Sequence, residues 1–412
     1  MSNRRMNRRD FLSRSAGGAV GVALAAVAAG PRRVLGANDR IAIAVIGSGG
    51  RGQYLMGEVN NLVKKQNVEM TVICDVWRVE RERAAAKVKA WTGREPRMFS
   101  RYRDVLALKD VDAVTIATPD FQHARILADA ARAGKDAYCE KPMASNMKDA
   151  RDALHAVLDN KRVVQVGTQR RSEGQFMAGA ELIQSGVLGT ISEIVTGWND
   201  CNPRWARPYH DVKEEDVDWE TYLMDLPKQP FDAQRFRRWH LYKDFTVGTP
   251  GLLGSHVIDI AHWYMDDYFA KSCVAHGGVY TWKDGREHAD TMECLWKYPK
   301  GFLLRYQTRL GNNFPMPEAA FFGIRGTFDT SSWKATGEGG GDDRLKEEIL
   351  VKPKPGVNHM ENWLECLRTR KTPNADVRAG YAHSVASIMA FLAWDSGRRQ
   401  IYDPEKEEIR EG

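Results

Sequence analysis

The sequence is poor in cysteine. Its six cysteines are scattered through 412 residues without any Cys-X-X-Cys pair. This spacing excludes a disulfide-stapled scaffold and the common structural zinc sites, so we expect buried free thiols and no metal. Long apolar runs are also missing: the most apolar extended stretch, residues 16–30, has 15 residues, fewer than the ~20 that span a membrane.

Most of the chain carries equal numbers of basic and acidic side chains. The formal net charge of +6 comes from residues 1–37, which hold seven arginines and one acidic residue. Residues 38–412 carry 53 basic and 53 acidic side chains. A nucleic-acid-binding protein needs a basic surface to neutralise phosphates, so we expect no nucleic-acid partner.

The basic N-terminus has the pattern of an export signal. Arg8 and Arg9 form a twin-arginine pair, the apolar stretch 16–30 follows, and Ala37 is a candidate cleavage point. These features predict a twin-arginine signal peptide over residues 1–37, export in the folded state and a periplasmic location. The alternative is an uncleaved membrane anchor or a basic tail.

The length predicts two domains, because one hydrophobic core rarely serves more than ~250–300 residues. From residue 40 onward, strand and helix patterns alternate, which predicts a parallel, doubly wound Rossmann domain over residues 38–167. The expected strands are 41–46, 69–74, 112–117, 136–139 and 163–167, and the expected helices are 53–65, 78–91, 122–133 and 147–159.

The second part of the sequence has a different pattern, in which strands follow one another with turn residues between them. It predicts an α+β domain over residues 168–412 with a large open, mainly antiparallel sheet. Its C-terminal helices can pack back on the first domain. The expected strands are 191–198, 271–281, 291–298, 302–310 and 319–326, and the expected late helices are 360–370 and 381–396.

A glycine-rich turn follows the first strand. Gly47, Ser48, Gly49, Gly50, Arg51 and Gly52 match G-x-G-x-x-G between a strand and a helix, as the motif requires. The glycines let the backbone approach a pyrophosphate, which the helix N-terminus attracts. Asp75 ends the next strand, where a carboxylate binds ribose hydroxyls and repels a 2′-phosphate. These residues therefore predict NAD rather than NADP.

Two further segments follow strands of the same sheet. Thr118, Pro119 and His123 come after the strand at 112–117, and Glu140 and Lys141 after the strand at 136–139. The carboxyl ends of parallel strands form the edge where ligands bind, so we place these residues around the nicotinamide. A lysine buried beside a cationic ring loses its proton readily and can serve as an acid or base.

These motifs, with Ala133-Gly134-Lys135 and the segment Val166–Arg171, resemble the glucose–fructose oxidoreductase/inositol dehydrogenase family, often written Gfo/Idh/MocA, and especially its exported bacterial members. The resemblance covers about residues 40–400. It implies a nicotinamide cofactor, sugar or polyol substrates, and a homodimer or homotetramer packed through the open sheet. The family's catalytic lysine maps onto Lys141. Gln169 then falls in the cofactor set and Arg170 in the substrate set.

The segment Gly254–Trp263 supplies a second catalytic candidate. Family members have a histidine near a helix start, often with an aspartate four positions earlier. His256 matches the histidine, but Leu252 occupies the aspartate position. We therefore predict that Lys141 or His256 is the acid/base, with Asp259 and His262 as supporting groups of the substrate site.

Residues 198–244 are rich in aromatic and polar side chains. Aromatic faces pack on the C–H surfaces of sugars while polar groups bond the hydroxyls, so we expect carbohydrate specificity here. The alternative is that these aromatic rings form the core of an irregular excursion or a subunit contact. The substrate candidates are Trp198, Asn199 and Trp205, in a stretch that also holds Trp219, Trp239 and His240.

Together the residues predict an NAD-dependent oxidoreductase acting on a secondary hydroxyl of a sugar, polyol or glycoside. A first alternative is a glycosidase that oxidises, eliminates, hydrates and reduces with NAD recycled in place, although Glu140-Lys141-Pro142 favours simple oxidoreduction. A second is a non-catalytic sugar sensor that retains NAD, which Lys141 and His256 disfavour. Because an exported enzyme cannot rely on free NAD, we expect the cofactor to be held tightly.

Overall fold

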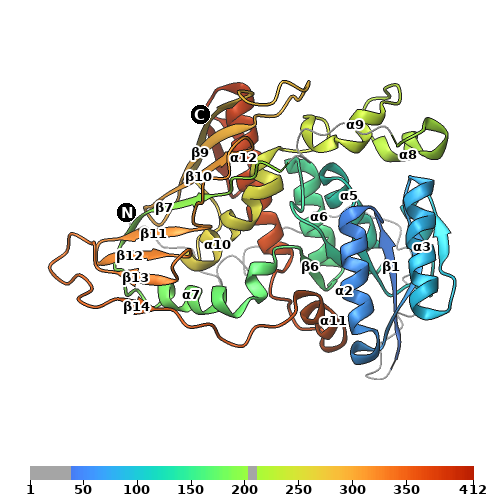
Figure 1. The fold of residues 1–412 in the computed structure, drawn as a ribbon, viewed down its shortest axis with the longest axis horizontal. Coiled ribbons are helices and arrows are strands. Elements are labelled where there is room, and N and C mark those ends of the chain that lie inside the picture. The colour runs from blue at the N-terminus through green and yellow to red at the C-terminus, as the bar shows by residue number, and fades with distance from the viewer. Residues whose placement is uncertain (1–38, 203–210) are drawn as a thin grey trace, which may run out of the picture. The chain divides into compact units, whose positions relative to one another are not determined.

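The computed structural model describes residues 39–202 and 211–412, so the predicted signal at 1–37 and Trp205 lie outside the described residues. Two sheets organise the described part of the chain (Figure 1). Within residues 39–202 and 211–412, no helix has the length and apolar character needed to cross a membrane.

The first sheet is parallel and confirms the predicted doubly wound arrangement, with the strand order β3-β2-β1-β4-β5-β6. In its strand β1, Ile43 and Val45 face a core shared with α2 and α11, whereas Ala44 and Ile46 face a core shared with α5. Both faces are buried, which explains the uninterrupted apolar run. The elements are β1 (Ile41–Ile46), α2 (Gly50–Gln66), β2 (Val68–Cys74), α3 (Arg78–Thr92), β3 (Arg97–Phe99), α4 (Tyr102–Leu106), β4 (Ala113–Ile116), α5 (Asp120–Arg132), β5 (Asp136–Cys139), α6 (Met147–Asp159) and β6 (Val164–Val166), with α11 (His359–Thr369) from the C-terminal part.

The second sheet has ten strands in the order β14-β13-β12-β11-β7-β10-β9-β8-β15-β16 and is mainly antiparallel, as predicted. Its one parallel pair is β10 with β7. Helices α7, α10 and α12 share a buried core with this sheet. The elements are η1 (Gln169–Ser172), α7 (Gly174–Gln184), β7 (Ile191–Gly197), η5 (Pro250–Gly254), α10 (Ser255–Met265), β8 (Ser272–Gly278), β9 (Thr291–Lys297), β10 (Leu303–Arg309), β11 (Ala320–Gly323), β12 (Gly326–Asp329), β13 (Lys334–Thr336), β14 (Ile349–Leu350), α12 (Val377–Ser396), β15 (Gln400–Asp403) and β16 (Glu408–Glu411).

Between β7 and η5 the chain makes an excursion whose described residues, 198–202 and 211–249, form no strand of either sheet. Its helical pieces are η3 (Glu214–Asp216), α8 (Trp219–Leu223), α9 (Ala233–Arg237) and η4 (Trp239–Leu241). One isolated antiparallel bridge joins it to the first sheet's side of the molecule, between Trp77 and Val217.

Some predicted boundaries are wrong. The single strand expected at 319–326 is a tight hairpin, β11 and β12, in which Gly323 pairs with Gly326. The turn residues Ile324 and Arg325 carry none of the usual Gly, Asn or Pro signals, so the pattern concealed the reversal. The first helix begins at Gly50, not at residue 53, because the last residues of the glycine motif, Gly50 to Gly52, already belong to its first helical turn. Short strands β3 and β13 to β16 were not predicted, because two to four residues carry too little periodicity.

Candidate functional site

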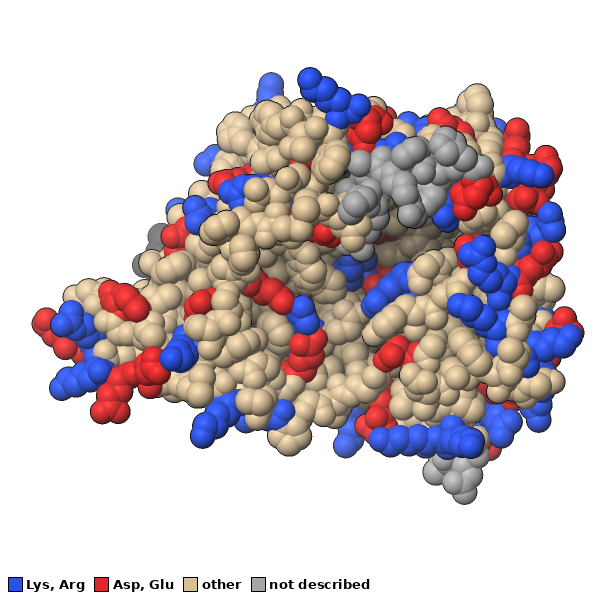
Figure 2. Space-filling view, viewed as in Figure 1, with Lys and Arg blue, Asp and Glu red and all other residues tan. Residues whose placement is uncertain are grey.

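A cavity of about 650 Å³ lies at the carboxyl ends of the parallel strands. Its lining residues come from the ends of β1, β2, β4 and β5, from the excursion, and from the segment that enters α10. On the face shown in Figure 2, acidic and basic side chains are interspersed around a central hollow. Thirteen of the predicted site residues line the cavity: Gly47, Gly49, Gly50, Arg51, Asp75, Thr118, Pro119, His123, Glu140, Lys141, Gln169, Trp198 and His256.

The glycine turn is sterically obligatory. Gly47 has a φ of +83°, and a Cβ on it would lie 2.7 Å from the Ala117 carbonyl carbon. A Cβ on Gly52 would lie 1.9 Å from the Gly47 carbonyl oxygen. The backbone therefore packs directly against the end of β4 and leaves the N-terminus of α2 open to the cavity, where its unpaired N–H groups favour an anion.

Asp75 fixes this turn and also faces the cavity. Its Oδ2 accepts hydrogen bonds from the Ser48 N–H at 2.7 Å and the Ser48 hydroxyl at 3.3 Å, and its Oδ1 accepts one from the Trp77 N–H at 2.9 Å. Burial raises the pKa of Asp75 above its ordinary value, and these hydrogen bonds oppose that rise. Ser48 itself is fully buried behind the carboxylate and does not line the cavity.

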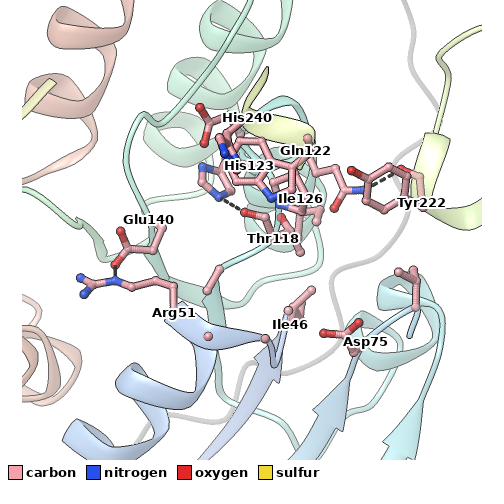
Figure 3. Close-up of a pocket in the computed structure, with 18 of the residues that line it drawn as sticks. Ile46, Arg51, Asp75, Thr118, Gln122, His123, Ile126, Glu140, Tyr222 and His240 are labelled. Carbon is pink, nitrogen blue, oxygen red and sulfur yellow. Dashed lines mark hydrogen bonds and ion pairs between the residues drawn. The ribbon is translucent and has the colours of Figure 1, made fainter. Parts of the chain in front are cut away.

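The Thr118–His123 segment begins α5 and is tied to the lysine loop. The His123 ring nitrogens lie 2.7 Å from the Thr118 carbonyl oxygen and 2.8 Å from the Pro142 carbonyl oxygen. Figure 3 shows His123 beside Thr118, with Arg51 and Glu140 at one end of the site and Asp75 at the other. His123 therefore joins the two segments that were predicted to surround the nicotinamide.

Glu140 and Lys141 emerge from β5 with separate partners. The Arg51 Nε donates to Glu140 at 2.6 Å, which links the first turn of α2 to the lysine loop. The Lys141 ammonium donates to the Leu252 carbonyl oxygen at 2.5 Å. The Lys141–Pro142 peptide bond is cis. At the position where the family resemblance implied an aspartate side chain, the lysine thus meets a backbone carbonyl.

His256 lies one residue into α10, and its ring centroid is 5.6 Å from that of Trp198. Burial and the nearby Lys141 ammonium lower the pKa of His256 well below 6.5. The imidazole is therefore neutral at neutral pH. It can hold a hydroxyl group in place or exchange a hydrogen bond with it, without adding positive charge beside the lysine.

Four other predicted residues do not line the cavity. The Arg170 guanidinium pairs with Glu318 and Glu173, and Asn199 donates to the Phe314 carbonyl oxygen. Asp259 is buried in a two-bond pair with Arg171, and His262 is buried against the Tyr298 hydroxyl. Asp259 lies three residues after His256 on α10, but this part of the helix surface is buried in the core and does not line the cavity.

Sequence reasoning missed the cavity wall beside Asp75. Trp77 follows β2, Ser100 follows β3 and Tyr102 begins α4; these residues line the cavity together with Phe236 and Arg237 of the excursion. Of these residues, only Trp77 could have been predicted from the sequence to lie near the cofactor site, because it stands two residues after Asp75. Among the described residues, no three His, Cys, Asp or Glu side chains are grouped so that they could hold a metal ion.

Comparison with known proteins matches residues 41–168 to the family model described as "Oxidoreductase family, NAD-binding Rossmann fold" (GFO_IDH_MocA). An inositol 2-dehydrogenase of Rubrobacter xylanophilus is 31% identical over 56% of this chain and 67% of its own length. The uncharacterized oxidoreductase YrbE of Bacillus subtilis is 29% identical over 45% of this chain, and only about half of YrbE, 54%, is covered. A glycosyl hydrolase family 109 protein of Stenotrophomonas maltophilia is 27% identical over 55% of this chain and 46% of its own length.

Solved structures share the fold over nearly the whole chain. The WlbA dehydrogenase from Bordetella pertussis, in complex with NADH and UDP-GlcNAcA, has a TM-score of 0.65 and 22% identity, covering 89% of this chain and 99% of its own. A levoglucosan dehydrogenase in complex with NADH has a TM-score of 0.66 and 17% identity, covering 88% and 98%. At these identities the likeness supports the architecture.

Proposed function

We propose that this chain, which belongs to the Gfo/Idh/MocA family of oxidoreductases, transfers a hydride between tightly held NAD and a secondary hydroxyl of a sugar, polyol or glycoside. The observation that carries the proposal is that one cavity joins the glycine turn and Asp75 to Lys141 and His256. A dinucleotide site and a pair of proton-handling side chains thus share one space.

The residues present fit a dinucleotide. The turn at Gly47 and Gly52 admits no Cβ because the backbone packs closely there, whereas Gly49 borders open space in the cavity that a pyrophosphate would occupy. The Asp75 carboxylate faces the cavity where ribose hydroxyls would bind, and Thr118, Glu140 and Gln169 would surround the nicotinamide end. When bound, the nicotinamide accepts or returns the hydride.

The protein's own part is to handle the proton. Lys141 is held toward the cavity by the Leu252 carbonyl. As the neutral amine it takes the hydroxyl proton when the alcohol is oxidised, and as the ammonium it returns that proton in the reverse direction. His256 donates or accepts a hydrogen bond with the same hydroxyl and orients it. The ion pair between exposed Arg51 and buried Glu140 fixes the loop that carries the lysine.

The cofactor preference gives a first prediction. We expect the wild-type protein to bind NADH at least about tenfold more tightly than NADPH, because the Asp75 carboxylate repels a 2′-phosphate. In Asp75→Ser this preference should shrink or reverse. Because burial raises the pKa of Asp75, lowering the pH should protonate it early and weaken the preference. Dissociation constants for the two reduced cofactors test this, and equal or tighter NADPH binding by the wild type would refute the assignment.

His256 gives a second prediction. His256→Ala should lower kcat by about tenfold or more, since the substrate hydroxyl loses a hydrogen-bond partner. The lowered pKa adds a condition: the wild-type pH–rate profile should show no break near 6.5 that belongs to this residue. A break near 6.5 that disappears in His256→Gln would show that the histidine titrates during catalysis.

Retention of the cofactor gives a third prediction. We propose that residues 1–37 export the folded, loaded protein to the periplasm, and that it works there as a homodimer or homotetramer. Recycling in place requires slow release, so the dissociation constant for NAD should be well below micromolar, roughly −8 kcal/mol or better. Protein purified, dialysed exhaustively and assayed without added NAD should remain active. Protein that is inert until NAD is supplied would contradict this.

The experiment that tests the proposed function uses the loaded protein and its own bound cofactor as the reporter. Each of a panel of inositols, sugars and glycosides is added, and absorbance of the reduced nicotinamide is followed through one turnover. Reduction by a polyol or sugar supports hydride transfer. The similarity to family 109 glycosyl hydrolases favours the second candidate, a glycosidase, which would release aglycone with no net reduction. No reduction and no aglycone across the panel would leave the sensor alternative.

A further inference from the structure

Residues 211–246, called here the aromatic excursion, leave the second sheet and pack against the first. In Figure 1 its helices α8 and α9 lie near α3 and α5. Its core is an aromatic cluster in which Tyr222 and Phe236 of the excursion meet Trp77, which precedes α3, and Phe121, in the first turn of α5. Ring centroids of Trp77 and Phe236 are 5.9 Å apart, and those of Phe121 and Tyr222 are 5.6 Å apart.

The excursion is anchored at two separate strand ends. After β2, the Asp218 N–H donates to the Val76 carbonyl at 3.0 Å, next to the Trp77–Val217 bridge. After β4, the Gln122 side chain donates to the Tyr222 carbonyl at 2.6 Å, and the Thr246 hydroxyl donates to Asp120 at 2.7 Å. Bonds at both places, together with the buried aromatic cluster, hold this segment as a fixed wall.

The part of the cavity that this wall encloses begins at Asp75. Trp77, whose N–H bonds Asp75, lines the cavity. From the excursion, Met224 and Arg237 also line it, and the Arg237 guanidinium stacks on the Trp77 ring at 4.8 Å from its centre. Figure 3 shows Tyr222 and Asp75 at the end of the site away from the Arg51–Glu140 pair.

We propose that the aromatic excursion is a built part of the cofactor site and covers its adenosine half. The inference rests on the proposed function, since Asp75 marks the ribose end only if the cavity holds a dinucleotide. An adenine beyond that ribose would find the flat guanidinium of Arg237, which the buried Trp77 ring supports from behind and which can stack on an aromatic base. A wall fixed at two strand ends adds contacts to the adenosine that must break before the adenosine leaves, so it slows dissociation.

The aromatic stretch that the sequence suggested for sugar binding is then divided: the part near Asp75 serves the cofactor, whereas Trp239 and His240 also line the cavity, with His240 beside His123 in Figure 3. A sugar under oxidation must reach Lys141 and His256, whereas Met224 and Arg237 belong to the Asp75 end of the cavity. Trp219 does not line the cavity at all, because its ring stacks on Tyr222 at a centroid distance of 4.9 Å. Trp198 keeps its place beside His256.

The test compares two arginines on the same short helix, α9. Arg237→Ala removes a cavity-lining side chain, and Arg235→Ala is the matched control, because Arg235 does not line the cavity and instead pairs with Asp244 and Glu287. Met224→Ala is a second lining variant. Full-length loaded protein is used, the rate of NADH release is measured after a chase with excess NAD, and ADP-ribose and nicotinamide mononucleotide are titrated as competitors. Thermal unfolding confirms that each variant is folded.

We expect Arg237→Ala to speed NADH release and weaken ADP-ribose binding by about tenfold, with nicotinamide mononucleotide affinity unchanged. Met224→Ala should shift both in the same direction, and Arg235→Ala should shift neither. Unchanged release in both lining variants, with a raised KM for the sugar, would overturn the inference and leave the proposed function intact. Equally faster NADH release in all three variants would overturn the proposed adenosine contact, because it would mean that any loss of packing in the excursion speeds release. A wild type that binds no NADH would refute the proposed function itself.

Discussion

Lys141→Met should lower kcat by about 10²- to 10⁴-fold, the usual effect of removing a general acid or base. Methionine keeps the length and apolar stem of lysine but has no group that takes a proton. The lysine's ammonium donates to the Leu252 carbonyl. After burial, its charge is the next cause that lowers the pKa of His256, so the ammonium lies at the same end of the cavity as the histidine. NADH binding should persist, because the glycine turn and Asp75 are untouched.

The measurement pairs single-turnover reduction of the bound cofactor with an NADH binding isotherm for each protein. Lys141→Arg should be nearly as impaired as Lys141→Met, since a guanidinium keeps the charge but does not release its proton near neutral pH. Lys148→Met, an exposed lysine at the start of α6, is the matched control and should leave kcat unchanged. Near-normal kcat in Lys141→Met would refute the assigned mechanism.

Asp259→Ala should destabilise the fold by about 3–5 kcal/mol, because it leaves the Arg171 guanidinium buried without its partner. The two side chains are 1% and 9% exposed and share two hydrogen bonds of 2.8 Å. Burial opposes ionisation of Asp259, but the Arg171 charge outweighs it and holds the pKa below the ordinary value. The carboxylate is therefore charged at neutral pH, and its stabilising effect should be lost only as the pH falls through this lowered pKa.

Denaturant unfolding at neutral pH measures the loss. The double variant Arg171→Met/Asp259→Leu should recover most of the stability, since apolar side chains of similar size can replace a buried pair. Glu348→Ala, which breaks the exposed pair with Lys334, should cost less than about 1 kcal/mol. If Asp259→Ala instead kept its stability and raised the KM for the sugar, the sequence-based placement of Asp259 in the substrate site would be right.

The Arg171–Asp259 pair also connects the cofactor part of the site with the helix that carries His256. Arg171 lies in η1, directly after β6 of the first sheet, and Asp259 lies in α10, the helix that carries His256. The bond between them joins the Gln169 segment to the histidine helix. A loss of activity in Asp259→Ala beyond the loss of folded protein would therefore reflect displacement of His256.

The sequence by itself determined the parallel sheet and one edge of the site. Apolar runs followed by Gly47, Asp75, Thr118 and Lys141 place those residues at strand ends, and parallel strands bring their carboxyl ends to one edge. That reasoning needs only local patterns and a general rule of topology. It succeeded for the sheet because both of its faces are buried, so that β1 is an uninterrupted apolar run and β2 is apolar from Val72 to its end.

Only the tertiary structure decided which side of α10 is core, what the aromatic excursion covers and which group meets the lysine. Helical spacing puts His256 and Asp259 on related faces, but it does not say where the cavity ends and the buried Arg171 begins. Tryptophan and tyrosine occur both in sugar-binding surfaces and in packed cores, so their identity alone does not tell which role they have. That depends on contacts with residues about 100 positions away, such as the hydrogen bond from Gln122 to Tyr222. The hydrogen bond from Lys141 to the Leu252 carbonyl could not be predicted from the sequence. Every residue has a backbone carbonyl, and only the fold determines which one lies beside the lysine.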